Sequence, residues 1–128
     1  MIGGGYWATG IIVAYRADTD SWWATVDFYD DGFIGDDDPA AGIVSTQGTL
    51  RTRYPVKGLS AAIDVVKCDA ERMGVSFRED GVVGPYVYYL GDGVNDDYPP
   101  PDGWRGMVNE QAQRLGWRPM YRDEAADA

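Results

Sequence analysis

A chain of 128 residues with 45% hydrophobic residues is long enough and apolar enough to bury one globular core. Its formal net charge of −10 disfavours nucleic acid and anionic membranes as direct partners, because both bind proteins through lysine and arginine. The chain has no histidine and one cysteine, which excludes Ser–His and Cys–His catalysis, histidine-bearing zinc sites and an internal disulfide.

The N-terminal part of the chain predicts a β-hairpin. Residues 6–16 alternate as a strand does, Asp18 to Ser21 are turn residues, and residues 22–29 predict the second strand. One face of the first strand is expected to carry Trp7, Ile11, Val13 and Tyr15. In the second strand, Trp22, Ala24, Val26 and Phe28 form the expected core face, while Trp23, Thr25, Asp27 and Tyr29 share the other face.

A third strand and a helix are predicted next. The strand covers residues 43–54 and ends before Pro55, and the helix covers residues 59–73 and ends before Gly74. One face of the strand is expected to carry Val44, Thr46, Leu50 and Tyr54. The apolar stripe of the helix consists of Leu59, Ile63, Val66, Ala70 and Met73.

The last part of the chain predicts two short strands over residues 75–79 and 82–90, joined by a turn at Asp80 and Gly81. After the proline-rich segment 91–103, Asp102 is expected to cap a helix over residues 104–115. Its apolar face consists of Trp104, Met107, Val108, Ala112 and Leu115. Residues 117–121 are expected to add a last strand.

This element order, β-β-β-α-β-β-α-β, predicts an α+β fold. The expected architecture is a mainly antiparallel sheet of about five or six strands with two helices packed on one face. Residues 1–122 are expected to form a single domain, and residues 123–128 an acidic tail that frays.

Composition also indicates where the protein acts. A single cysteine is typical of a reducing compartment, no signal peptide is recognisable at the N-terminus, and no apolar stretch reaches the roughly 18 residues of a bilayer span. We therefore expect a cytoplasmic protein. Aspartate supplies 17 of the 21 acidic residues, a bias typical of a GC-rich bacterial or phage genome, which by itself could explain the acidity.

Acidic residues are concentrated in two stretches. Residues 17–40 hold eight aspartates and residues 79–102 hold six acidic residues, and neither stretch contains lysine or arginine. A DNA strand carries one charge per roughly 3.4 Å of axis, whereas the aspartates of residues 27–38 provide one per roughly 6–7 Å even when the chain is extended. Mimicry of nucleic acid therefore requires the two stretches to meet in space.

Aromatic residues accompany both acidic stretches, and exposed aromatic side chains beside charges are typical of protein–protein hot spots. The leading hypothesis is a non-enzymatic acidic protein that occupies the basic site of a partner, such as a nucleic-acid-binding enzyme, as anti-defence inhibitors and immunity proteins do. No cofactor is expected. The predicted partner-binding residues are Trp23, Asp27, Tyr29, Asp30, Asp31, Phe33, Asp36, Asp37, Asp38, Asp92, Asp96, Asp97 and Tyr98.

Two alternatives remain open at this point. The first is a small structural or regulatory homo-oligomer whose acidity serves solubility alone. Ala61, Val65 and Cys68 form a second stripe on the helix over residues 59–73, which could pack against the helix over residues 104–115 or against another subunit. The second alternative is a hydrolase that depends on a divalent metal. The consecutive Asp36, Asp37 and Asp38 alternate in direction, however, and Asp92, Asp96 and Asp97 lack the spacing of a calcium loop.

Overall fold

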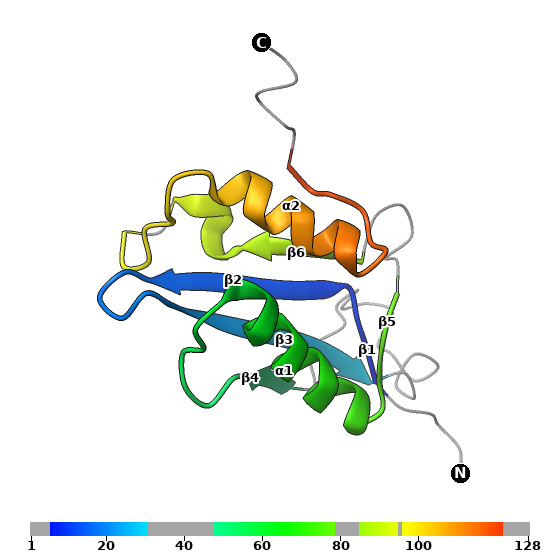
Figure 1. Ribbon diagram of the computed structural model, residues 1–128. Coiled ribbons are helices and arrows are strands. Elements are labelled where there is room, and N and C mark those ends of the chain that lie inside the picture. The colour runs from blue at the N-terminus through cyan, green and yellow to red at the C-terminus, as the bar shows by residue number, and fades with distance from the viewer. Residues whose placement is uncertain (1–5, 31–47, 79–84, 95, 122–128) are drawn as a thin grey trace, which may run out of the picture.

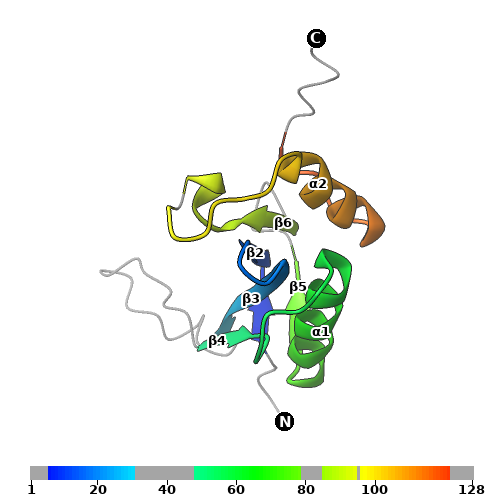
Figure 2. The same ribbon diagram turned by 60° about the vertical axis from the view of Figure 1, so that its left-hand side comes forward.

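Two helices cover one face of a mixed six-stranded sheet in the computed structural model, which describes residues 6–30, 48–78, 85–94 and 96–121 (Figures 1 and 2). The strands are β1 (Tyr6–Ala8), β2 (Gly10–Arg16), β3 (Ser21–Asp30), β4 (Gly48–Arg51), β5 (Val75–Phe77) and β6 (Tyr86–Tyr89). The helices are α1 (Leu59–Arg72) and α2 (Trp104–Arg114), and a short 3-10 helix, η2 (Leu90–Gly93), follows β6. The α+β class is confirmed.

The sheet is mixed rather than mainly antiparallel. Its strand order is β5-β1-β3-β2-β6, with β4 paired to β3 on the other edge. The pairs β1–β3, β2–β3 and β3–β4 are antiparallel, whereas β1–β5 and β2–β6 are parallel. The two short strands of residues 75–90 do not pair with each other, because each extends the outer edge of a different segment of the first hairpin strand.

A β-bulge divides the first hairpin strand into β1 and β2. Trp7 is opposite Tyr29, whereas Ile12 is opposite Thr25, so the register between the two strands shifts by one residue at Thr9 and Gly10. One extra residue reverses the alternation of side chains. The prediction that Trp7 shares a face with Ile11, Val13 and Tyr15 is therefore wrong: Trp7 lies on the opposite face of the sheet.

Glycine is required at this bulge. A Cβ atom on Gly10 would lie 2.1 Å from the backbone oxygen of Tyr86, a distance that no pair of such atoms tolerates. The close approach lets β6 pair with β2 directly beside the bulge, with Gly10 of β2 opposite Tyr86 of β6. On the other side of the bulge, Ala8 of β1 is opposite Phe77 of β5. β5 thus ends and β6 begins beside the same point of the hairpin strand.

The first helix matches its prediction closely. α1 buries Leu59, Ala62, Ile63, Val66 and Ala70 against the sheet and ends before Gly74, whose φ of 92° is readily adopted by glycine. Met73 was expected in the apolar stripe, but it lies beyond the last helical turn and is 45% exposed.

The second helix begins without the predicted aspartate cap. Gly103, with a φ of 76°, occupies the N-cap position of α2, and no side chain caps the helix, so the prediction for Asp102 is wrong. Of the expected apolar face, Trp104, Val108 and Ala112 are buried and Leu115 packs at the edge of the core, while Met107 is 38% exposed.

Residues 117–121 do not form the last strand that was expected. The side-chain amide of Asn109 in α2 accepts a hydrogen bond from the backbone N–H of Tyr121 at 3.0 Å and donates one to its carbonyl. This contact satisfies the N–H and the carbonyl of Tyr121, which would otherwise be available for strand pairing, and Pro119 has no N–H to donate. The tail of residues 122–128 lies outside the described residues, as do 43–47, the predicted turn at Asp80 and Gly81, and 82–84.

Both helices pack on the same face, and the core lies between them and the sheet (Figure 2). β3 contributes Trp22, Ala24, Val26 and Phe28 to this core, as predicted. Within the described residues, neither helix has the length and apolar character that a bilayer crossing requires.

Candidate partner-binding face

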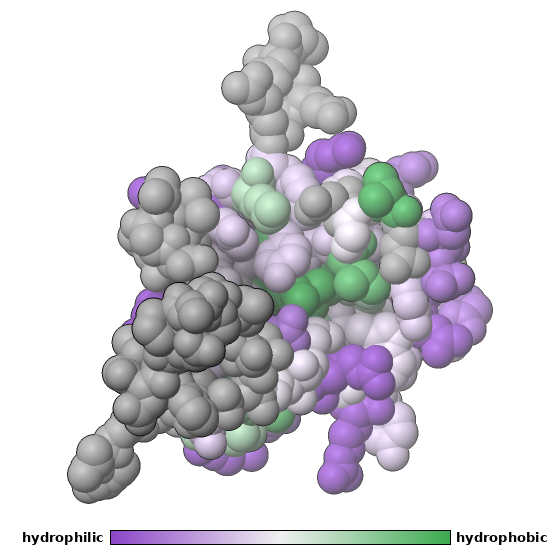
Figure 3. Space-filling view, turned by 180° about the vertical axis from the view of Figure 1, so that it is seen from behind, coloured by the Kyte–Doolittle hydropathy of each residue, from purple (hydrophilic) through white to green (hydrophobic). Residues whose placement is uncertain are grey.

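The face of the sheet that carries neither helix gathers the candidate site. Register places the side chains of this helix-free face in order across the sheet: Tyr88 beside Ile12, Ile12 beside Thr25, and Thr25 beside Arg51. Figure 3 views the molecule from this side and shows apolar side chains at the surface among polar ones. The helix-free face is defined here by Trp7, Ile12, Trp23, Thr25, Asp27, Tyr29, Thr49, Arg51, Tyr86 and Tyr88.

Five aromatic side chains from three strands lie on the helix-free face. Trp7 and Tyr29 stack with ring centroids 4.5 Å apart, and Tyr86 meets Tyr88 edge-on at 5.7 Å. Together with Trp23, all of them are half-buried rather than buried or fully exposed. Trp23, Asp27 and Tyr29 were predicted from the sequence, and the structure places these three on one face. Trp7, Tyr86 and Tyr88 were not predicted as binding residues.

Different signals could have found the missed residues. Tyr86 and Tyr88 alternate with the buried Val87 and Tyr89, so their shared face was readable from the sequence, but their position beside β2 was not. Trp7 reaches this face through the bulge at Thr9 and Gly10, which no alternation pattern reveals.

Arginines from this chain already stack on two of these rings. The guanidinium of Arg51 lies 4.6 Å from the ring centroid of Trp23, and that of Arg78 lies 5.5 Å from the ring centroid of Trp7. The negative faces of the aromatic rings attract such cations. The helix-free face is therefore chemically suited to guanidinium groups.

A carboxylate from the described residues lies among the aromatic rings. Asp27 accepts a hydrogen bond from the Thr49 hydroxyl at 2.8 Å. Burial, followed by the negative charge of Asp27, raises the pKa of Tyr88 to about 12, so the Tyr88 hydroxyl stays protonated at neutral pH. The face thus offers a carboxylate acceptor and a neutral phenol side by side.

A small pocket of about 80 Å³ opens beside Trp23. Ile12, Thr25 and Leu90 provide apolar walls, and Arg51 and Tyr98 also line it. Hot-spot side chains of protein partners typically insert into pockets of this kind.

The other predicted binding residues fall into two groups. Asp31, Phe33, Asp36, Asp37 and Asp38 lie outside the described residues. Asp30 ends β3, and Asp92 lies in η2. Asp96 and Asp97 are exposed, and Asp97 and Tyr98 line a cleft of about 480 Å³ at the β2–β3 turn.

The cleft at the β2–β3 turn is also lined by Arg16, Asp18 and Pro99. Arg16 Nη2 lies 2.6 Å from Asp18 Oδ2, and its hydrogen bonds hold the pKa of the Asp18 carboxyl below its usual range. The backbone oxygen of Tyr98 accepts a hydrogen bond from the buried Tyr89 hydroxyl at 2.8 Å, which fixes this segment to the core.

The two acidic stretches approach each other at this cleft, which Asp18 of residues 17–40 and Asp97 of residues 79–102 both line. Of the aspartates of residues 27–38, only Asp27 and Asp30 lie within the described residues, so whether that segment meets the second stretch is not tested. The nine residue steps from Ser21 to Asp30 span about 30 Å, so Asp30 ends β3 far from the β2–β3 turn and its cleft.

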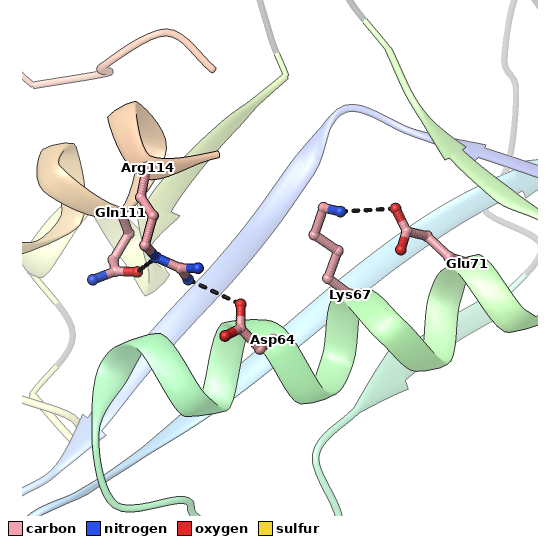
Figure 4. Close-up of polar contacts among 5 residues, drawn as sticks. All are labelled: Asp64, Lys67, Glu71, Gln111 and Arg114. Carbon is pink, nitrogen blue, oxygen red and sulfur yellow. Dashed lines mark hydrogen bonds and ion pairs between the residues drawn. The ribbon is translucent and has the colours of Figure 1, made fainter. Parts of the chain in front are cut away.

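The second stripe of α1 does not pack against α2. Ala61, Val65 and Cys68 are all exposed, so the intramolecular form of that prediction is wrong. The helices are instead bridged at their polar edges, where Arg114 of α2 binds Asp64 of α1 at 3.0 Å and also Gln111 at 2.8 Å (Figure 4). Lys67 and Glu71 form a separate ion pair at 2.8 Å along α1 (Figure 4).

In the part of the chain that the structure describes, no three carboxylate or thiol side chains converge as a metal site would require. The geometry thus offers the helix-free face and the cleft at the β2–β3 turn as surfaces for binding. Comparisons with protein-family models, with curated proteins and with solved structures found no match for this chain.

Proposed function

We propose that this chain is a non-enzymatic binding protein whose helix-free face occupies a basic, arginine-bearing surface of a partner protein, such as the nucleic-acid-binding site of an enzyme. The observation that carries the proposal is the grouping of Trp23, Asp27 and Tyr29 with Trp7, Tyr86 and Tyr88 on one half-buried face. Aromatic rings of this kind supply most of the binding energy in protein interfaces.

Charge supports a basic partner. The net charge of −10 attracts a basic surface over a distance of about a Debye length, roughly 8 Å at physiological salt, and accelerates the encounter. The same charge repels nucleic acid, which aromatic sheet faces otherwise bind by stacking.

The contacts within the face favour arginine over lysine in the partner. Arg51 and Arg78 show that the rings of Trp23 and Trp7 accept a guanidinium plane. Tyr29, Tyr86 and Tyr88 present further rings around Asp27, whose carboxylate can pair with an incoming guanidinium. Lysine offers a point charge without the flat surface that stacks on these rings.

Peptide binding tests the proposal directly. The probes are capped arginine and lysine nonapeptides and a single-stranded oligothymidylate of similar length, and binding is followed by tryptophan fluorescence and calorimetry. We expect the arginine peptide to bind more tightly than the lysine peptide, with an affinity that falls steadily between about 50 and 500 mM salt. Trp23→Ala and Tyr88→Ala should each weaken binding about tenfold, or about 1.4 kcal/mol.

Met73→Ala is the matched control, because it removes an apolar side chain that is 45% exposed at the C-terminal end of α1, away from the helix-free face. It should leave peptide binding unchanged. Tighter binding of the oligothymidylate than of the arginine peptide, or an affinity unaffected by Trp23→Ala and Tyr88→Ala, would contradict the proposed function.

A further inference from the structure

A bulge in the segment after β4 pushes one tyrosine out of the sheet. Thr52 still pairs with β3, its N–H donating to the Ala24 oxygen at 3.1 Å, and Val56 rejoins β3 opposite Trp22 through two hydrogen bonds of 2.8 Å. Three residues, 53–55, are therefore opposite Trp23 alone. Pro55 has no N–H to donate to β3. The sequence predicted Tyr54 on the same face as Leu50, but this prediction is wrong, because the bulge leaves Tyr54 73% exposed.

Positively charged residues flank Tyr54 in the sequence. Arg51, Arg53 and Lys57 are exposed, and no acidic residue occurs between positions 39 and 63. Among the described residues, neither Arg53 nor Lys57 has an ion-pair partner. Arg53, Tyr54 and Lys57 thus form a basic patch, in a segment held by hydrogen bonds on both sides, on a chain of net charge −10.

A second patch has the opposite charge and a similar form. Val94 is 82% exposed and lies close in sequence to Asp96 and Asp97, and Asp97 lines the cleft of about 480 Å³ together with Arg16, Asp18 and Pro99. These residues, Asp18, Val94, Asp96, Asp97 and Pro99, are named the acidic patch. Tyr54 and Val94 are the most exposed large apolar side chains in the described part of the chain. Cationic residues lie next to Tyr54 in the sequence, whereas Val94 is followed by the carboxylates of Asp96 and Asp97, and the Arg16 that lines the same cleft is paired with Asp18.

The two patches flank the same end of the molecule. The segment after β4 and the segment after η2 lie on opposite sides of the β2–β3 turn in both ribbon views (Figures 1 and 2). The contacts support this placement. Val56, in the segment after β4, pairs with Trp22 at the start of β3, and Tyr98, in the segment after η2, lines the same cleft as Asp18 of the turn.

We infer that a second copy of this chain covers both patches, in a two-fold dimer formed at the β2–β3 turn. A two-fold axis near the turn brings the basic patch of each copy onto the acidic patch of the other, so both contacts form at once and the assembly closes. Tyr54 enters the cleft beside Val94 and Pro99 of the partner, and Arg53 and Lys57 meet its carboxylates. The two small patches make this a weak dimer rather than an obligate one.

Salt gives this dimer a distinctive signature. At about 0.01 M salt the Debye length is roughly 30 Å, so the whole charge of −10 on each copy opposes association. At about 0.15 M it is roughly 8 Å, so the facing patches dominate, and at about 1 M it is roughly 3 Å and their attraction is screened. Dimerisation should therefore be strongest at intermediate salt, unlike binding to a basic partner, which weakens throughout.

Sedimentation equilibrium of the full chain tests the inference. Tyr54→Ala, Arg53→Glu and Asp96→Arg should each weaken dimerisation at least about tenfold. An equimolar mixture of Arg53→Glu and Asp96→Arg should restore it, because every contact in the mixed dimer again joins opposite charges.

Two controls separate this surface from others. Arg118→Glu makes the same charge change at an exposed position outside both patches, and Val65→Ala trims the α1 stripe; both should dimerise normally. Near-ultraviolet circular dichroism confirms that each variant is folded. A chain that stays monomeric up to about 1 mM overturns the dimer, since even weak specific interfaces are populated there. A dimer that tolerates Tyr54→Ala and Arg53→Glu but not Val65→Ala would place the interface on α1 instead.

Discussion

The two tryptophans at the start of β3 are neighbours in the chain and lie on opposite faces of the sheet. Trp22 is 3% exposed and packs against Tyr15 and Tyr89, with ring centroids 5.0 and 6.2 Å away. Trp23 is half-buried and its ring carries the guanidinium of Arg51. The same residue type thus has a structural environment on one face and an accessible one on the other.

This difference extends along the whole strand. The core face of β3 is apolar throughout, whereas the helix-free face mixes aromatic rings with Thr25 and Asp27. A surface that served stability alone would not need a carboxylate among its rings, because burying a charge is costly. We expect stability to depend on the first face and binding on the second.

The largest expected effect comes from substituting the two tryptophans in turn. Trp22→Ala should lower the free energy of unfolding by about 3–5 kcal/mol, because it leaves a cavity in the core. Trp23→Ala should lower it by only about 1 kcal/mol, since it loses a partly exposed ring and its contact with Arg51. Urea denaturation of both variants measures the contrast, and equal losses would mean that the helix-free face is a second core.

A smaller loss of stability is expected from a substitution at the bulge between β1 and β2, where the side-chain alternation reverses. Gly10→Ala places a Cβ atom against the Tyr86 backbone oxygen, so β2 and β6 must separate, at a cost of about 2–3 kcal/mol. Gly106→Ala is the control: nothing lies within 4 Å of the added Cβ in α2, and alanine should stabilise the helix by about 0.5–1 kcal/mol. Similar thermal shifts in the two variants would contradict the close approach at the bulge.

The smallest effect concerns Tyr88 and appears only at high pH. The folded chain holds the pKa of Tyr88 at about 12, above the usual value of 10.0, so folding disfavours its ionisation. The resulting stability is complete below pH 10 and is lost as the pH rises towards 12. Tyr88→Phe should therefore lose less stability than the parent chain in this window, as thermal denaturation at several pH values would show. An identical decline in both would mean that Tyr88 ionises as a solvent-exposed tyrosine does.

The candidate site was predictable only where it depends on local alternation. Trp23, Asp27 and Tyr29 share a face because each is an even number of residues from the others in one strand, and that spacing is visible in the sequence. Tyr86 and Tyr88 join them through parallel pairing of β6 with β2, a contact between residues more than 70 positions apart. Long-range pairing of this kind leaves no periodic signal within either segment.

The α+β class, the span of α1 and the two faces of β3 follow from the amino-acid sequence alone, because helix and strand periodicities are local properties of the chain. The parallel edges, the face of Trp7 and the exposure of Tyr54 become visible only in the folded chain. The parallel edges depend on long-range pairing, and the other two depend on where one strand slips by a residue or more against its neighbour. A bulge reverses or expels every side chain that follows it, and its position is set by the partner strand, as at Gly10 beside Tyr86.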